Sequence, residues 1–243
     1  MTSQTVGMEI AGHLATLTLR RPLVNESMAF ELREACEWIG QDRDVRIVVL
    51  TGSGDAFCRG TDLVRSLGNL RVADAVAAVQ QPVIAALNGD AIDQGLELAL
   101  ACDIRIASSR ARLGLTQVEQ GMMPWDGGTQ RLPRLIGLGR AMDMVLTSRL
   151  LDAEECLEAG LVNEMVESGS LVDRTRELAS AISKHGPIAT RYLKEALLKG
   201  ADMTLEHGLR LEADLNIILQ STADRAEGVR SFLERWPPQY RNE

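Results

Sequence analysis

The sequence predicts an α/β protein with a core over residues 1–185 and a helical C-terminal appendage over residues 186–243. Three observations favour this class. Short, continuous apolar runs alternate with segments of helical periodicity in the first half of the chain. After Pro133 nearly every segment has helical periodicity. The composition, with 45% apolar and 25% charged residues, is that of an ordinary globular protein, and no linker-like tract separates the two parts.

The first half of the chain is expected to open on two strands and then to alternate between helices and buried strands. Residues 5–20 predict two short strands around Gly12 and His13, because apolar and polar residues alternate there. Residues 27–41 predict a helix with Ser27 as its N-cap and one apolar stripe. Three apolar runs without alternation predict buried parallel strands, and a segment between the last two predicts a helix. These strands are 46–50, 82–87 and 103–107, and the helix is 94–101.

The second half is expected to be mostly helical, with a single strand at 161–166. Gly160 ends one helix, and Gly186-Pro187 separates two others. The expected helices are 138–149, 152–160, 170–185, 187–199, 203–220 and 222–235.

Charge and composition argue against several classes of protein. Twenty-six basic against thirty-four acidic residues give a net charge of −8, so neither a nucleic acid nor an anionic membrane is expected as partner. The apolar runs are too short to span a membrane, and the N-terminus lacks the pattern of a secretory signal. The four cysteines have no paired spacing, which favours the reducing cytoplasm. The three histidines are too scattered to predict a metal site.

The first segment that could carry chemistry, residues 51–63, follows a buried strand and is rich in glycine. Glycine permits a tight turn and lets a ligand approach the backbone. The segment is not a phosphate loop, because no Gly-Lys-Ser or Gly-Lys-Thr follows. Phe57 stands where a dinucleotide-binding loop has its third glycine. A plain glycine turn explains the same pattern.

The second segment, residues 85–103, ends a strand at Asn88-Gly89 and begins a helix near Gln94. The first turn of that helix offers unpaired N–H donors, which can hold an oxyanion. Glu97 lies in this turn between aliphatic residues, so burial would raise its pKa while the helix N-terminus would lower it. The alternative is a surface glutamate that stabilises the helix dipole.

The third segment, residues 115–134, contains a loop fixed by Pro124 and Gly127-Gly128, after which a helix is expected near Thr129. A capped surface loop explains this pattern as well. The side chains that could meet a ligand here are Gln117, Glu119, Trp125 and Asp126.

Taken in this order, the three segments resemble the crotonase family of enoyl-CoA hydratases and isomerases. The motifs are in register, and the likeness covers nearly the whole chain. They are Ala-Phe-Cys-Arg-Gly-Thr-Asp-Leu at 56–63, Gly-Leu-Glu-Leu-Ala at 95–99, Ala-Cys-Asp-Ile-Arg-Ile-Ala at 101–107, Gly-Gly-Thr-Gln-Arg-Leu-Pro at 127–133, and Asp224, Glu227-Gly228, Phe232-Leu233 and Pro237 near the C-terminus.

The resemblance implies a spiral core of repeated β-β-α turns, and homotrimers or hexamers built partly through the C-terminal helices. It also implies that an enolate formed from a coenzyme A thioester is stabilised, with no metal and no permanently bound cofactor. Two backbone N–H groups hold the thioester oxygen as negative charge develops there. By position, these groups belong to Arg59 and Gln94. The family usually has glycine where Gln94 stands, so the glutamine is expected either to narrow the pocket or to add a polar contact.

One of the family's two catalytic glutamates is missing. Hydratases of this family use the pair to position and activate a water. Glu97 matches the first, but Gln117 stands at the second, and an amide cannot exchange a proton. Two substitutes are open: Glu119, if the segment is a strand whose alternate residues share a face, and Asp126. Asp126 is favoured, because its loop borders the reacting acyl carbons in the family, whereas Glu119 in an irregular loop would be solvated.

The resemblance also suggests which residues bind the thioester. Nineteen residues separate Asp62 from Pro82, where the family usually has a longer insertion with an active-site helix. The acyl end of the pocket is therefore expected to be open, or closed by a neighbouring subunit. The expected substrate-binding residues are Arg21, Phe57, Gly60, Thr61, Asp62, Gly95 and Trp125, and Arg59 and Arg65 are further arginines that could contact the coenzyme.

The leading hypothesis is an enoyl-CoA hydratase or isomerase in which Glu97 is the principal acid and base. The loss of the second glutamate leaves open a specialised hydrolase, dehalogenase, decarboxylase or carbon–carbon lyase of an acyl-CoA. A non-catalytic acyl-CoA binder on the same fold is the third hypothesis, and the net charge of −8 argues against the RNA binding of some relatives.

Overall fold

The computed structural model describes residues 4–62 and 68–243, which contain two β-sheets. The larger sheet has the strand order β1-β2-β3-β5-β7-β10, and its strands are parallel except for the β1–β2 pair. The smaller sheet has the order β4-β6-β8-β9, and only β8 and β9 are antiparallel. The strands are β1 (Val6–Ala11), β2 (Leu14–Leu19), β3 (Ile47–Gly52), β4 (Ala56–Cys58), β5 (Val83–Leu87), β6 (Asp90–Ile92), β7 (Ile104–Ser108), β8 (Arg112–Gly114), β9 (Leu151–Asp152) and β10 (Glu164–Val166).

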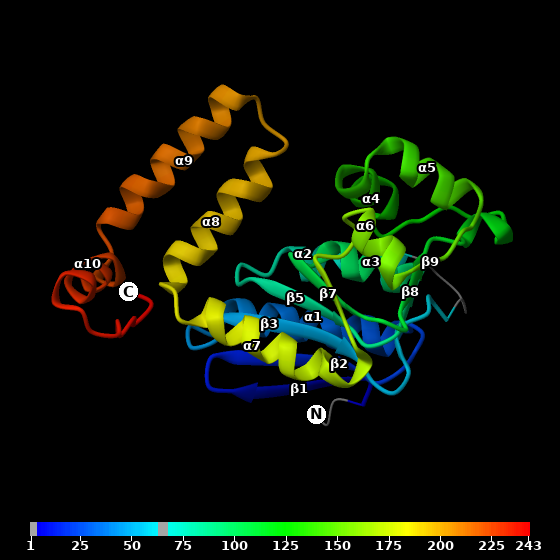
Figure 1. The fold of residues 1–243 in the computed structure, drawn as a ribbon, viewed down its shortest axis with the longest axis horizontal. Coiled ribbons are helices and arrows are strands. Elements are labelled where there is room, and N and C mark those ends of the chain that lie inside the picture. The colour runs from blue at the N-terminus through cyan, green and yellow to red at the C-terminus, as the bar shows by residue number, and fades with distance from the viewer. Residues whose placement is uncertain (1–3, 63–67) are drawn as a thin grey trace.

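Helices cover the larger sheet and continue into a C-terminal arm (Figure 1). The α-helices are α1 (Glu26–Gln41), α2 (Ala73–Ala77), α3 (Gln94–Ala101), α4 (Gly128–Ile136), α5 (Leu138–Leu146), α6 (Ala153–Glu158), α7 (Leu171–Ser183), α8 (Pro187–Gly200), α9 (Leu205–Gln220) and α10 (Ala223–Glu234). Three short 3₁₀ helices are η1 (Gly68–Leu70), η2 (Gln117–Gln120) and η3 (Ser168–Ser170).

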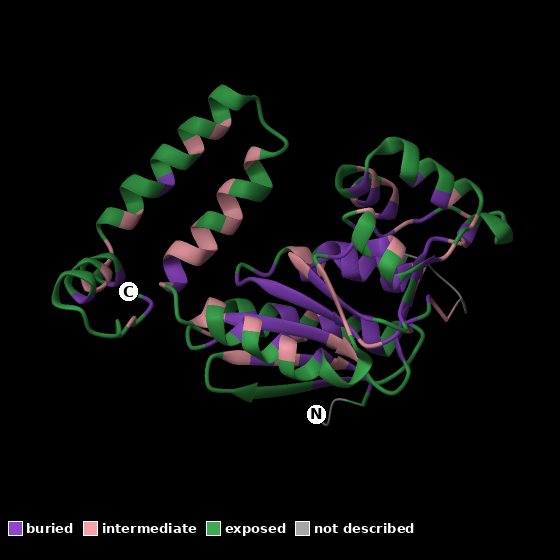
Figure 2. Ribbon diagram, in the orientation of Figure 1, coloured by how far each residue is buried: buried purple, intermediate pink, exposed green. Residues whose placement is uncertain are grey.

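The central strands are buried on both faces, as their continuous apolar sequences predict. Alternate residues of β3 enter two different apolar clusters, because successive side chains of a strand point to opposite faces. Val48 and Leu50 join the cluster that contains α1, whereas Ile47 and Val49 join the one that contains α7. The sheet is therefore the middle layer of the core. Its buried central strands are purple in Figure 2.

The core is a spiral of repeated β-β-α units. In each unit a long strand of the larger sheet is followed by a short strand of the smaller sheet and then by a helix. The units are β3-β4-α2, β5-β6-α3 and β7-β8-α4. The predicted α/β class and the repeated β-β-α architecture are thus confirmed.

Several boundaries differ from the prediction. Helix α1 begins one residue earlier, and its N-cap is Asn25 rather than Ser27, because the Asn25 side chain accepts a hydrogen bond from the Met28 N–H at 2.9 Å. The strand predicted over 161–166 shortens to β10. The short strands β4, β6, β8 and β9 were not predicted, since segments of two or three residues carry no periodicity.

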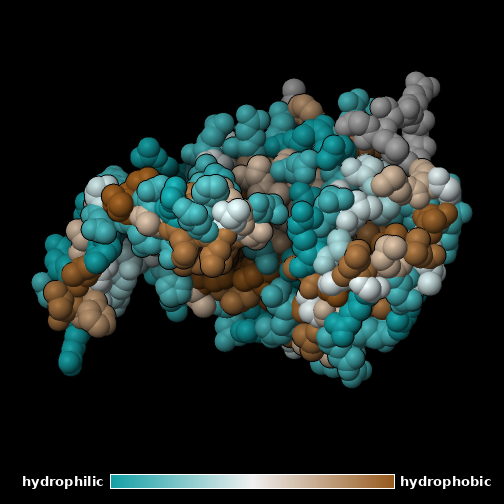
Figure 3. Space-filling view, turned by 90° about the horizontal axis from the view of Figure 1, so that it is seen from above, coloured by the Kyte–Doolittle hydropathy of each residue, from teal (hydrophilic) through white to brown (hydrophobic). Residues whose placement is uncertain are grey.

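The last three helices form an arm that projects from the core in Figure 1. Helices α8 and α9 pack against each other as an antiparallel pair. Large apolar side chains on these helices are exposed, among them Leu193, Leu197, Leu205, Leu209 and Ile217. In Figure 3 apolar side chains gather on this arm. Within the described ranges, no helix is both long and apolar enough to cross a membrane.

The four cysteines are free and buried in the same apolar cluster of the core. Burial raises the pKa of Cys36 in α1, Cys102 after α3 and Cys156 in α6 to about 12, and that of Cys58 in β4 to about 11. None is therefore a thiolate near neutral pH.

Candidate active site

Glu97 is fully buried in the first turn of α3, a helix whose residues are all buried. One of its carboxylate oxygens, Oε1, accepts hydrogen bonds from the N–H groups of Asp126 and Gly128, both at 2.8 Å. The other, Oε2, is buried and has no hydrogen-bond partner among the described residues. One oxygen thus fixes the side chain, and the other is left free for chemistry.

The environment of Glu97 raises its pKa from 4.5 to about 7. Burial is the largest cause, because it disfavours the charged form. The two N–H donors lower the pKa, while the negative charges of Asp126 and Asp93 raise it further. A carboxyl group with a pKa near neutrality can both accept and release a proton under working conditions.

Two glycines let the backbone approach closely enough to build this site. A Cβ atom at Gly95 would lie 1.9 Å from the carbonyl oxygen of Cys58, so only glycine allows α3 to begin against strand β4. A Cβ atom at Gly128 would lie 3.1 Å from Glu97 Oε1 and 3.0 Å from side-chain atoms of Leu115 and Pro124. Glycine there leaves room for the Gly128 N–H to reach the carboxylate.

Asp126 is the second buried carboxylate of the site. Its Oδ2 accepts hydrogen bonds from the N–H groups of Val72 and Ala73, at 2.8 and 3.1 Å, and from Gln94 Nε2 at 3.0 Å. Its Oδ1 is buried without a hydrogen-bond partner among the described residues, and Arg71 Nε lies 3.9 Å away. Asp126 therefore resembles Glu97 in having one oxygen fixed by hydrogen bonds and the other without one, but its second oxygen also has the charge of Arg71 nearby.

Gln117, which stands at the position of the second family glutamate, and Glu119, the other candidate for the second acid and base, lie in different surroundings. Gln117 is buried, and neither its amide oxygen nor its amide nitrogen has a hydrogen-bond partner among the described residues. Glu119 is exposed two residues later. The segment is the 3₁₀ helix η2 and not a strand, so residues two apart do not share a face. Glu119 is thus at the surface while Gln117 points inward.

The two backbone N–H groups predicted to hold the thioester oxygen differ in whether they already donate a hydrogen bond. The Arg59 N–H donates to the Pro22 carbonyl oxygen at 2.6 Å, so it is already paired. The Thr61 N–H and the Gln94 N–H have no acceptor among the described residues. The Thr61 hydroxyl donates to Gln94 Oε1 at 2.6 Å, which brings these two residues together. A parallel bridge between Val24 and Thr61 turns the Thr61 N–H away from the segment of Val24. The sequence indicated Thr61 as a binding residue but did not indicate that its N–H group is unpaired among the described residues.

The other predicted binding residues are distributed between the site and its surroundings. Phe57 is a fully buried core side chain, and Arg21 is exposed. The Arg59 side chain pairs with Asp55 and Asp90, and Arg65 lies outside the described residues. Gly60, Asp62 and Trp125 lie in the two loops described above, and the buried Trp125 Nε1 has no hydrogen-bond partner among the described residues.

The segment between Asp62 and Pro82 contains a helix that contacts Asp126, although the segment is shorter than the insertion usual in the family. Helix α2 begins at Ala73, and its N-terminal N–H groups bind Asp126. Arg71, two residues before the helix, forms an ion pair with Asp74 at 3.0 Å. Arg131 forms an ion pair with Asp74 and donates a hydrogen bond to the Asp126 carbonyl oxygen, both at 2.9 Å. These contacts fix α2 against the loop that holds Asp126.

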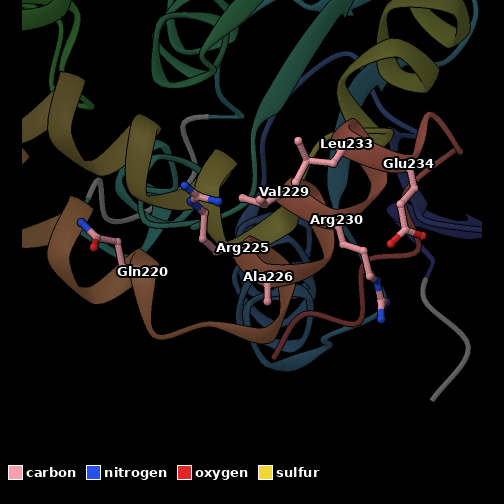
Figure 4. Close-up of a pocket in the computed structure, with 7 residues that line it drawn as sticks. All are labelled: Gln220, Arg225, Ala226, Val229, Arg230, Leu233 and Glu234. Atoms are coloured by element: carbon pink, nitrogen blue, oxygen red, sulfur yellow. The ribbon is translucent and has the colours of Figure 1, made fainter.

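A hollow of about 490 Å³ lies elsewhere, between the end of α9 and the helix α10. Figure 4 shows its lining, which includes Arg225, Arg230 and Val229. None of its lining residues belongs to α3 or to the loop that holds Asp126. Among the described residues, no group of three or more His, Cys, Asp or Glu side chains is placed to hold a metal ion.

Two neighbouring buried carboxylates, one in the first turn of α3 and one in the loop before α4, make this part of the β-β-α spiral the candidate active site of an α/β enzyme. The sequence matches the enoyl-CoA hydratase/isomerase family over residues 9–243, and the chain belongs to this family. Its members are lyases and isomerases that act on acyl-CoA, and this protein is accordingly an acyl-CoA enzyme.

Individual relatives cover almost the whole chain. The (E)-benzylidenesuccinyl-CoA hydratase of Thauera aromatica is 39% identical over 97% of this chain and 98% of its own. The crotonyl-CoA hydratase of Syntrophomonas wolfei is 34% identical over 97% of both chains. The crystal structure of an enoyl-CoA hydratase from Bacillus anthracis superposes with a TM-score of 0.95 at 38% identity, over 99% of this chain and 100% of that one.

Proposed function

We propose that this protein adds water to an enoyl-CoA, or moves its double bond, with Glu97 and Asp126 as the two proton-transfer groups. One observation carries the proposal. Each carboxylate is fixed through one oxygen by backbone N–H groups, and each keeps its other oxygen buried without a hydrogen bond among the described residues; that of Asp126 has only the Arg71 guanidinium, 3.9 Å away. A buried carboxylate oxygen without a hydrogen bond costs free energy, about 1–3 kcal/mol, which a catalytic role explains.

The oxyanion hole in this proposal consists of the N–H groups of Thr61 and Gln94, with Thr61 in place of Arg59. Both donors are unpaired among the described residues, and the side chains that carry them are in contact. They would hold the thioester oxygen as negative charge develops on it, which stabilises the enolate and makes the β-carbon of the enoyl group electrophilic toward water. In hydration one carboxylate takes a proton from water while the hydroxide adds to the β-carbon. The other carboxyl group gives a proton to the α-carbon, so the net reaction adds H and OH.

Gln117 favours a second candidate, because an amide stands where hydratases of the family have a proton-transfer group. A specialised hydrolase, dehalogenase, decarboxylase or carbon–carbon lyase of an acyl-CoA would use the same oxyanion hole without a second glutamate. The exposed apolar side chains of α8 and α9 support a homotrimer or hexamer formed through residues 186–243, as the resemblance implies. The four unpaired cysteines support a cytoplasmic location.

Mass spectrometry of an acyl-CoA panel in heavy water, with crotonyl-CoA included, tests the proposal. A mass gain equal to one D₂O is expected for hydration, and deuterium uptake at the α-carbon alone is expected for isomerisation. Release of free coenzyme A would favour hydrolysis. No change in any thioester would contradict all of these reactions for the acyl groups used.

A further inference from the structure

The amide of Gln94 is fully buried and is held by three polar contacts. Its Oε1 accepts the hydrogen bond from the Thr61 hydroxyl at 2.6 Å. Its Nε2 donates to Asp126 Oδ2 at 3.0 Å and to the Leu70 carbonyl oxygen. Both partners of the nitrogen are acceptors only, which fixes the orientation of the amide: turned over, it would place its oxygen against a carboxylate and a carbonyl. The glutamine therefore adds polar contacts at the position where the family usually has glycine.

These contacts join three segments that are far apart in the sequence. Thr61 belongs to the first loop, Leu70 precedes α2, and Asp126 belongs to the loop before α4. Asp126 also donates its backbone N–H to Glu97. A continuous chain of hydrogen bonds thus runs from Thr61 through Gln94 and Asp126 to Glu97.

The geometry points to the Gln94 side chain as a positioning residue for this reaction. We propose that its amide, which bonds Asp126 Oδ2 and the Thr61 hydroxyl, holds the Asp126 carboxylate and the Thr61 N–H in their working positions relative to the Gln94 N–H. The inference rests on the proposed function, because it assigns Gln94 to the same oxyanion hole and carboxylate pair. Small displacements of such groups are costly, since a shift of about 1 Å can reduce a rate about 100-fold.

The test is Gln94→Met, which keeps the length and volume of the side chain and removes its three polar contacts. Gln81→Met is the matched control. Gln81 is also buried, at 2% exposed, and its amide likewise makes three hydrogen bonds, here from Nε2 to the carbonyl oxygens of Ile39, Asp42 and Val45, none of which belongs to the site. The expected result is a fall in kcat of about 100-fold in Gln94→Met with KM little changed, and no comparable fall in Gln81→Met.

A double-mutant cycle with Asp126→Asn separates positioning from general loosening of the fold. If Gln94 acts through Asp126, the double variant should lose little more activity than Asp126→Asn alone. Fully additive losses would overturn that link. Thr61→Val supports the test if Gln94→Met folds poorly, because it removes only the hydroxyl that bonds Gln94 and keeps the Thr61 N–H. A smaller fall in kcat is expected for this variant.

Amide hydrogen exchange tests the same contacts without an activity assay. In Gln94→Met the amides of residues 58–62 and 70–77 should exchange faster than in Gln81→Met. If the wild type converts no acyl-CoA, the proposed function fails. The exchange result still decides whether the Gln94 amide holds the segments of Thr61 and Leu70 in place. If the wild type is active but Gln94→Met matches Gln81→Met in both kcat and exchange, the inference about Gln94 is wrong.

Discussion

Replacing Glu97 by Gln should stabilise the protein at alkaline pH while it removes the activity. Burial raises the pKa of Glu97 from 4.5 to about 7, so the folded protein keeps a proton that the unfolded chain releases between these values. The stabilisation from this proton is complete below about pH 4.5 and is lost as the pH rises through 7. At about 1.4 kcal/mol per pH unit, the whole effect is about 3 kcal/mol, of which about 2 kcal/mol falls between pH 5.5 and pH 8.

The assay is urea unfolding of the wild type and Glu97→Gln near pH 5.5 and near pH 8, at one protein concentration. The difference in the free energy of unfolding between variant and wild type should shift by about 2 kcal/mol in favour of the variant at the higher pH. Glu119→Gln is the control, because it removes a carboxylate from the same part of the chain at an exposed position. A difference that is equal at the two pH values would refute the assignment of a buried, protonated Glu97.

Three further predictions concern single positions. Asp126→Asn should lower kcat at least 100-fold if Asp126 transfers a proton. Loss of its negative charge should also lower the pKa of Glu97 seen in the pH profile of kcat/KM. An unchanged rate would remove Asp126 from the mechanism. Glu119→Gln should leave kcat and KM unchanged, because its side chain is exposed, and a marked loss of rate would return Glu119 to the site. Leu197→Asp places a charge on the exposed apolar surface of α8 and should shift the size-exclusion peak toward the monomer, whereas an unshifted oligomer peak would exclude this surface as the interface.

The α/β class followed from local patterns, because continuous apolar runs predicted the buried strands, whereas the β-β-α spiral followed from the resemblance to the crotonase family. For Glu97 the aliphatic neighbours favoured a buried carboxylate, but the helix start left a surface glutamate open, and the structure shows the buried one. The five-residue helix α2 was missed, since one turn of helix is too short to show a period and is stable only through its tertiary contacts.

The details of the site depend on contacts between segments that are distant in sequence. Which backbone N–H group stays unpaired near Thr61 is decided by the bridge to Val24, and no residue pattern encodes it. The placement of Asp126 depends likewise on the docking of Val72 and Ala73 against its side chain. Sequence reasoning named Asp126 and Gln94, but their contact follows only from the assembled fold.

The buried cysteines allow local opening of the folded protein to be measured by thiol labelling. Thiolates attack thiol reagents, so these four side chains react only when the surrounding structure exposes them and lets their pKa values fall. Cys58 ends strand β4, three residues before Thr61, whereas Cys36 and Cys156 lie in α1 and α6. Pulsed labelling followed by peptide mass analysis would therefore time the opening of each region separately, with no introduced label. Bound thioester that closes the site should slow the labelling of Cys58 more than that of Cys156.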